Sequence, residues 1–156
     1  MSLTLITNRS ALDASNLLAL REKVKNRTAT ESERTLWVSS QNGAYNYSDM
    51  NRVGNAIQYL AGLLNGYGYP VTVSPKTDWD TSGIPQQAQM AQYLSDLNAI
   101  KSALYGTKEV PSSMSNLTYE QANTIEALLE EIETNIYNMA ASFVYSGEIY
   151  CGEVYP

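Results

Sequence analysis

Apolar residues recur at alternating intervals of three and four positions in three stretches of the chain. This spacing places them on one face of an α-helix, which completes a turn every ~3.6 residues. Three main helices are therefore predicted near residues 48–64, 86–104 and 119–143, each with an apolar stripe that needs a partner surface. The stripes consist of Met50, Val53, Ile57, Leu60 and Leu64; Met90, Tyr93, Leu97, Ile100 and Leu104; and Ile125, Leu129, Ile132, Ile136, Met139 and Phe143.

Two shorter helices are predicted earlier in the chain. The first opens at Thr7 or Ser10, and the second follows Thr30-Glu-Ser-Glu33, which has the pattern of a capping box. The same pattern at Thr118-Tyr-Glu-Gln121 opens the last main helix, and Ser48 is expected to begin the first one.

These elements predict a mainly α fold, an antiparallel helical bundle with short extended N- and C-terminal arms. Each stripe covers only a short run of heptad positions, which favours a shared internal core over an intermolecular coiled coil. The predicted organisation is an N-terminal arm over residues 1–9, a helical bundle domain over residues 10–144 and an extended C-terminal arm over residues 145–156.

The C-terminal residues carry a tandem repeat, Tyr145-Ser-Gly-Glu-Ile149 followed by Tyr150-Cys-Gly-Glu-Val154. Glycines with aromatic and β-branched neighbours favour an extended segment over a helix. The segment is either a terminal strand packed on its own domain or an arm that joins a neighbouring copy, with Leu3–Ile6 as its expected strand partner. The expected assembly-interface residues are Leu3, Leu5, Tyr145, Ile149, Tyr150, Val154 and Tyr155.

Charge is distributed unevenly along the 156 residues, whose net charge is −6. Residues 1–108 hold all 10 basic residues and 8 acidic ones, whereas residues 109–156 hold 8 acidic residues and no basic one. Nucleic-acid binding needs clustered Lys and Arg, so no nucleic-acid partner is expected. The asymmetry allows a basic end of one copy to meet an acidic end of another, in keeping with a homo-oligomer.

The residue types of most catalytic sites are missing. The chain has no histidine and one cysteine, Cys151. This excludes Ser-His-Asp and Cys-His nucleophile systems, zinc sites with histidine ligands and an internal disulfide. No catalytic residue, metal or cofactor is predicted. No apolar run approaches the ~20 residues that cross a bilayer, so no membrane insertion is expected, and synthesis in the bacterial cytoplasm without a signal peptide is expected.

Carboxylates on the last helix are a first candidate for chemistry. Glu126, Glu130 and Glu133 share one helix face, where they could serve a hydrolase or hold a hard cation such as calcium. Their expected place on the polar face of an amphipathic helix favours simple solvation. Replacing all three with Gln is then expected to leave fold and function intact.

Aromatic residues beside acids are a second candidate. Asp78-Trp79-Asp80 has the composition of a sugar subsite, and a carbohydrate-binding module would use Tyr67, Tyr69 and Trp79 as glycan contacts. The alternative is an Asp-rich turn with Trp79 folded back onto the bundle.

The segment Gly43-Ala-Tyr-Asn-Tyr-Ser-Asp-Met-Asn-Arg-Val53 resembles a "GAYNxxDLNRV" segment in small proteins and domains of phages and prophages of Gram-positive bacteria. That family sits among tail and baseplate genes and supplies no catalytic residues. The resemblance spans nearly the whole chain and implies a structural role in a virion or phage-tail-like particle. Other segments are similar to the family's in the same order. Lys25–Trp37 precedes this segment, and those after it are Tyr69–Trp79, Ile84–Leu94, Leu117–Ala122 and Tyr145–Glu148.

The resulting hypothesis is a non-enzymatic virion structural protein of a phage tail or baseplate, or of a phage-tail-like particle. Its partners would be other tail proteins and further copies of itself. A carbohydrate-binding module that contacts the host cell surface is the alternative, and a cell-wall hydrolase that uses carboxylates is a third hypothesis.

Overall fold

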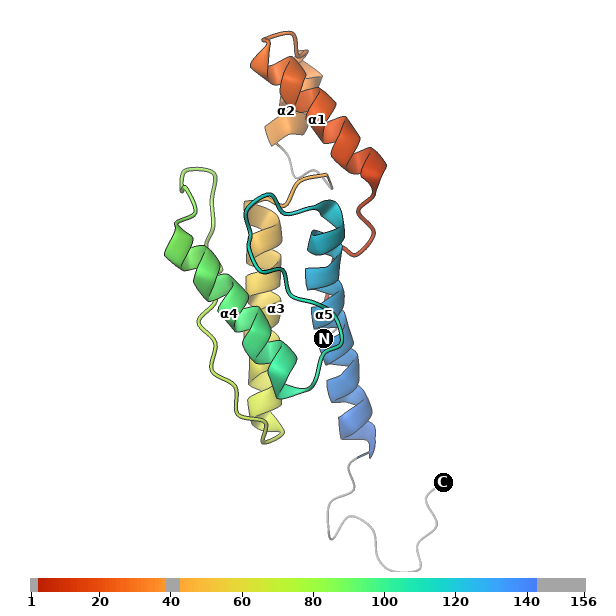
Figure 1. The fold of residues 1–156 in the computed structure, drawn as a ribbon, viewed down its shortest axis with the longest axis vertical. Coiled ribbons are helices and arrows are strands. Elements are labelled where there is room, and N and C mark those ends of the chain that lie inside the picture. Colours follow the sequence, from red (N-terminus) through yellow and green to blue (C-terminus); the bar gives the residue numbers. More distant parts are fainter. Residues whose placement is uncertain (1–2, 39–42, 143–156) are drawn as a thin grey trace, which may run out of the picture.

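The structure, a computed structural model, describes residues 3–38 and 43–142. These residues form helices joined by irregular segments and contain no β-strand, which confirms the predicted mainly α fold (Figure 1). The bounds of the main helices agree closely with the apolar stripes, although Phe143 lies outside the described residues. The helices are α1 (Ala11–Lys25), α2 (Glu31–Val38), α3 (Tyr47–Gly66), α4 (Gln87–Ala103) and α5 (Tyr119–Ser142).

Side-chain caps set the starts of most helices. Ser10 caps α1, with Asp13 N donating to Ser10 Oγ at 3.2 Å. The two predicted capping boxes form before α2 and α5, because Glu33 N and Gln121 N donate to the threonine hydroxyl three residues earlier. The cap of α3 is Asn46 rather than the predicted Ser48, since Asn46 Oδ1 accepts from Ser48 N at 2.8 Å.

Helices α3, α4 and α5 pack on one another and form the body of the protein, a helical bundle as predicted. The predicted stripes supply its core: Ile57 of α3, Leu97 of α4 and Ile132 of α5 are fully buried. Met90 and Leu104 lie half-buried against the core, and Met139 is also half-buried. The same spacing that defined the stripes therefore identifies the buried face of each helix.

The three body helices run in the same direction, which corrects the predicted antiparallel arrangement (Figure 1). Arg52, early in α3, binds Glu126, early in α5, and Tyr59 Oη, later in α3, lies 3.0 Å from Tyr137 Oη, later in α5. The length of the connections permits this arrangement. Residues 67–86 and 104–118 run back along the body, and about 15–20 extended residues easily span a helix of about 30 Å.

Asparagines on the helices hold extended segments onto the body. In each case the side-chain amide of the asparagine binds the backbone of one residue in the extended segment. Its Nδ2 donates to the carbonyl oxygen of that residue, and its Oδ1 accepts a hydrogen bond from the N–H of that residue. The amide thus supplies the two hydrogen bonds that a neighbouring strand would supply. Asn51 holds Trp79 (2.8 and 2.7 Å), Asn65 holds Val71 (3.0 and 3.0 Å) and Asn123 holds Arg9 (2.8 and 3.0 Å).

The N-terminal segment, residues 3–9, lies along α5 in the opposite direction. Leu3 N donates to both carboxylate oxygens of Glu133 at 3.2 Å, and Ile6 N donates to Glu126 Oε2 at 2.6 Å. Leu3 and Leu5 are half-buried against the core of their own chain. The segment is therefore an integral part of the body's surface.

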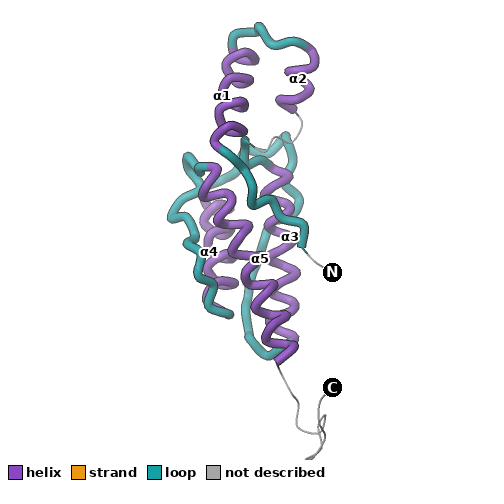
Figure 2. The backbone as a smooth tube through the Cα atoms, turned by 90° about the vertical axis from the view of Figure 1, so that its right-hand side faces the viewer, coloured by secondary structure: helices purple, strands orange, loops and turns teal. Residues whose placement is uncertain are grey.

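Helices α1 and α2 form a hairpin that projects from one end of the body (Figures 1 and 2). No residue of α1 is buried. Lys23 Nζ of α1 lies 2.5 Å from Glu33 Oε1 of α2 and joins the two helices. Gly43 contacts α1 so closely that a Cβ at this position would lie 2.2 Å from the carbonyl oxygen of Asp13.

Two glycines of α3 allow a matched test of this packing. A Cβ on Gly54 would lie 2.7 Å from the backbone oxygen of Lys76, so Gly54→Ala is expected to displace the 67–86 connection and cost about 1–3 kcal/mol. Gly62 has no atom within 4 Å of such a Cβ, so Gly62→Ala is expected to stabilise α3 by ~0.5–1 kcal/mol. Thermal melts of the two variants check this; equal shifts would show that the connection does not press on α3.

Candidate functional site

A buried ionic cluster joins the N-terminal segment, α3 and α5. It consists of Arg9, Asp49, Arg52 and Glu126, two cations and two anions. The side chains of Arg9 and Glu126 are 1% and 0% exposed, and that of Arg52 is 22% exposed. Charges at this depth are tolerated only when each has partners of opposite sign and hydrogen bonds to match.

The geometry of the cluster meets this requirement. Arg9 Nη2 lies 2.8 Å from Asp49 Oδ1 and 2.6 Å from Glu126 Oε1, while its Nη1 donates to the carbonyl oxygen of Ile6 at 2.6 Å. Arg52 binds Glu126 through two parallel hydrogen bonds of 2.9 and 2.7 Å and also donates to Asp49. Arg9 Nε is the one guanidinium nitrogen of Arg9 without a hydrogen bond.

Burial alone would lower the pKa of the Arg52 guanidinium, but its hydrogen bonds to Glu126 and Asp49 outweigh burial and raise this pKa above its ordinary value. Arg52 therefore stays charged. Both carboxylates are fully used by the two guanidinium groups and by backbone N–H groups, as shown by Ile6 N on Glu126 and Asn46 N on Asp49. The arrangement is that of a structural tie between segments far apart in sequence.

Tyr45 and Tyr93 close the cluster on one side. The guanidinium carbon of Arg9 lies 5.6 Å from the centroid of the Tyr45 ring, within the range of a cation–π contact. The hydroxyl of Tyr45 is hydrogen-bonded to that of Tyr93. Burial raises the pKa of both phenols well above the ordinary tyrosine value, so both remain neutral.

The expected solvation of the α5 glutamates is wrong for two of the three. Glu126 is fully buried in the ionic cluster and Glu133 is 6% exposed, whereas Glu130 is exposed as expected. The three glutamates were correctly placed on one side of the helix, but the N-terminal segment covers the part of it that carries Glu126 and Glu133 and leaves Glu130 exposed. Glu126 and Glu133 are occupied by Arg9, Arg52 and backbone N–H groups of this segment, so replacement of all three by Gln is no longer expected to be harmless.

The glycan-contact candidates do not form a common aromatic face. Trp79 is buried in the core at 6% exposure, as the alternative of a folded-back tryptophan anticipated. Tyr67 and Tyr69 are exposed near the end of α3. A sugar ring needs an accessible aromatic face for stacking, which Trp79 does not offer.

The assembly candidates divide into two groups. Leu3 and Leu5 are placed by the structure against their own core. Tyr145, Ile149, Tyr150, Val154 and Tyr155 lie outside the described residues, as does Cys151.

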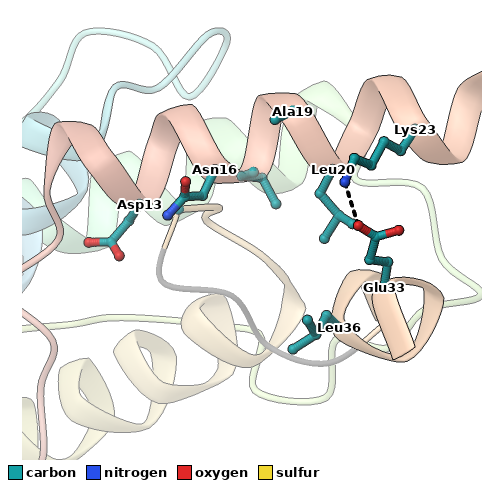
Figure 3. A pocket seen from close by; sticks show the side chains of 9 residues that line it. Asp13, Asn16, Ala19, Leu20, Lys23, Glu33 and Leu36 are labelled. Atoms are coloured by element: carbon teal, nitrogen blue, oxygen red, sulfur yellow. Dashed lines mark hydrogen bonds and ion pairs between the residues drawn. The ribbon is translucent and has the colours of Figure 1, made fainter. Parts of the chain in front are cut away.

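The α1–α2 hairpin carries a surface that sequence reasoning missed. Its exposed apolar side chains, here called the hairpin surface, are those of Leu12 (68% exposed), Leu18 (58%), Leu36 (51%) and Trp37 (39%). Leu36 also lines an open cleft of about 390 Å³ between the two helices, together with Leu17 and Leu20 (Figure 3). The only available signal was the weak apolar pattern of residues 11–25, which has no single stripe.

A second open groove lies between α4 and the 104–118 connection. It measures about 760 Å³ and is lined by Tyr45, Met50, Met90, Leu94 and Met114 among others. Methionine-rich walls adapt readily to different occupants. No charged side chain lines this groove, whose polar lining residues are Tyr45, Gln87, Ser112, Ser113 and Ser115.

Within residues 3–38 and 43–142, no group of three or more acidic or cysteine side chains is placed to hold a metal ion. None of the helices in this part of the chain is long and apolar enough to cross a membrane. Comparisons with protein-family models, with curated proteins and with solved structures found no match.

Proposed function

We propose that the chain is a non-enzymatic structural protein of a phage tail or baseplate, or of a phage-tail-like particle, and that it acts through protein–protein assembly. The observation that carries the proposal is the hairpin surface. Four large apolar side chains, two on each helix of the hairpin, are exposed on an element that projects from a body with a complete core of its own. An element that exposes several large apolar side chains is typical of an interaction site.

Two further observations support this function over a hydrolase. The buried carboxylates Asp49, Glu126 and Glu133 are engaged in holding segments of the chain together, which leaves them no access to a substrate. The "GAYNxxDLNRV"-like segment supplies Asn46, Asp49 and Arg52, and each of these side chains caps α3 or joins the ionic cluster. The part of the chain that resembles tail and baseplate proteins thus serves to build the fold.

The proposal is tested by particle incorporation. A tagged chain is produced in the bacterium that makes the particle, and assembled particles are purified by gradient centrifugation. The chain is expected in the particle fraction, and Leu18→Glu with Leu36→Glu is expected to reduce its amount at least about tenfold, since buried apolar anchors dominate interfaces. Ile84→Glu, which changes a still more exposed apolar residue outside the hairpin, is the control.

A wild-type chain that remains in the soluble fraction while particles form would contradict the structural role. Binding of the same wild-type chain to purified cell walls, lost in a Tyr67→Ala, Tyr69→Ala variant, would instead favour the carbohydrate-binding module.

A further inference from the structure

We propose that the hairpin surface binds residues 143–156 of a second copy of this chain, so that copies associate head to tail. The inference rests on the proposed assembly function and names its partner. It is carried by three independent features: the position of the hairpin relative to the end of α5, the charges of the two regions, and the apolar content of residues 143–156.

The first feature is geometric. The hairpin projects from the end of the body where α5 begins, whereas Ser142, the last residue of α5, lies at the opposite end (Figures 1 and 2). Helix α5 has 24 residues and is about 36 Å long at 1.5 Å per residue. The first repeat, Tyr145–Ile149, follows Ser142 by at most seven residues and reaches no further than about 24 Å. The first repeat therefore cannot reach the hairpin of its own chain. If it binds a hairpin, that hairpin belongs to another copy.

The second feature is charge. Residues 21–27, at the tip of the hairpin, include four basic residues and one acidic residue. Arg21, Arg27 and Arg34 are exposed and form no ion pair within the described part of the chain. Residues 143–156 contain Glu148 and Glu153 and no basic residue. Each glutamate can therefore meet a cation of the hairpin that has no ion-pair partner among the described residues.

The third feature is the match of apolar groups. Each repeat presents a tyrosine and a β-branched residue at a spacing of four, Tyr145 with Ile149 and Tyr150 with Val154. The hairpin offers the cleft lined by Leu17, Leu20 and Leu36 (Figure 3). Leu12 and Leu18 of α1 are also exposed. Tyrosine combines a large apolar ring with a polar tip and suits a cleft that opens to water.

An interface between two different surfaces has a direct consequence for symmetry. Each copy offers one hairpin and one C-terminal segment, so two copies joined by one contact still have one unused hairpin and one unused C-terminal segment between them. Such an interface closes into a ring, of two copies or more, when the rotation between copies brings these unused surfaces together, and it grows into an open chain otherwise.

The test uses self-association of the full chain by sedimentation equilibrium over a range of concentrations. The wild type is expected to self-associate as its concentration rises. Deletion of residues 143–156 and, separately, Leu36→Glu are each expected to weaken association at least about tenfold. Ile84→Glu is the matched control and is expected to associate as the wild type does. Raising the salt concentration is expected to weaken association, because exposed charges are screened.

Mixing the two defective chains gives the decisive result. The truncated chain keeps an intact hairpin and the Leu36→Glu chain keeps an intact C-terminal segment, so together they are expected to form a 1:1 complex that does not grow further. If the truncated chain does not fold, as judged by circular dichroism, a full-length Glu148→Lys, Glu153→Lys variant replaces it.

Three outcomes would overturn the inference: a monomeric wild type at all concentrations, unaltered association after loss of residues 143–156, or no complex in the mixture. None of them affects particle incorporation, which remains the separate test of the assembly function. Incorporation that depends on the hairpin, together with a monomeric wild type, would identify a different particle protein as the occupant of the hairpin surface.

Discussion

Replacing Arg9 with alanine is expected to lower the free energy of unfolding by about 3–5 kcal/mol, because it leaves buried Asp49 and Glu126 with one guanidinium group instead of two. The loss is large compared with the 5–15 kcal/mol that stabilises a typical domain. Arg9 is also the residue through which the N-terminal segment reaches α3. The same variant is therefore expected to release this segment from α5.

Urea denaturation measures the first effect and amide hydrogen exchange the second. The N–H groups of Leu3 and Ile6, which are bound to Glu133 and Glu126 in the wild type, are expected to lose their protection in the variant. Arg21→Ala removes an exposed arginine with no ion pair in the described residues and is expected to change stability by less than about 0.5 kcal/mol. Equal stabilities of the Arg9 and Arg21 variants would show that the cluster does not hold the fold together.

Replacing Ile132 with aspartate is expected to unfold the protein or to reduce its stability by more than about 4 kcal/mol. Ile132 is fully buried in the core formed by α3, α4 and α5, and the new carboxylate would lie among apolar side chains. Circular dichroism during thermal unfolding measures the effect. Thr134→Asp, an exposed position two residues further along α5, is the control and is expected to melt close to the wild type. A folded Ile132→Asp protein with wild-type stability would place this residue outside the core.

The helical positions of the core could be predicted from the sequence because the 3-4 spacing of apolar residues is a local property. Ile57, Leu97 and Ile132 occupy the predicted faces, and the capping boxes at Thr30 and Thr118 begin the helices they were expected to begin. The direction of the helices could not be predicted in this way. Long connections allow either direction, and the choice depends on how residues 67–86 and 104–118 pack along the body.

The ionic cluster was beyond local reasoning for the same reason. Arg9 and Glu126 are 117 residues apart in sequence, and nothing near Arg9 indicates a buried partner. The pairing of Arg52 with Asp49 at a separation of three residues was predictable, but its burial was not, because burial depends on the N-terminal segment that covers it. A glutamate on a helix face that looks polar in sequence can therefore be a buried anchor when another segment lies across that face.

The N-terminal segment also determines the order in which the fold is completed during synthesis. Leu3 is made 130 residues before its partner Glu133. At 5–20 residues per second this interval is on the order of ten seconds. Until then residues 3–9 have no α5 to bind, and the face of α5 that carries Glu126 and Glu133 is uncovered when the helix forms. Contacts between such distant residues slow folding, so the docking of residues 3–9 on α5 is expected to be a late and slow step in folding.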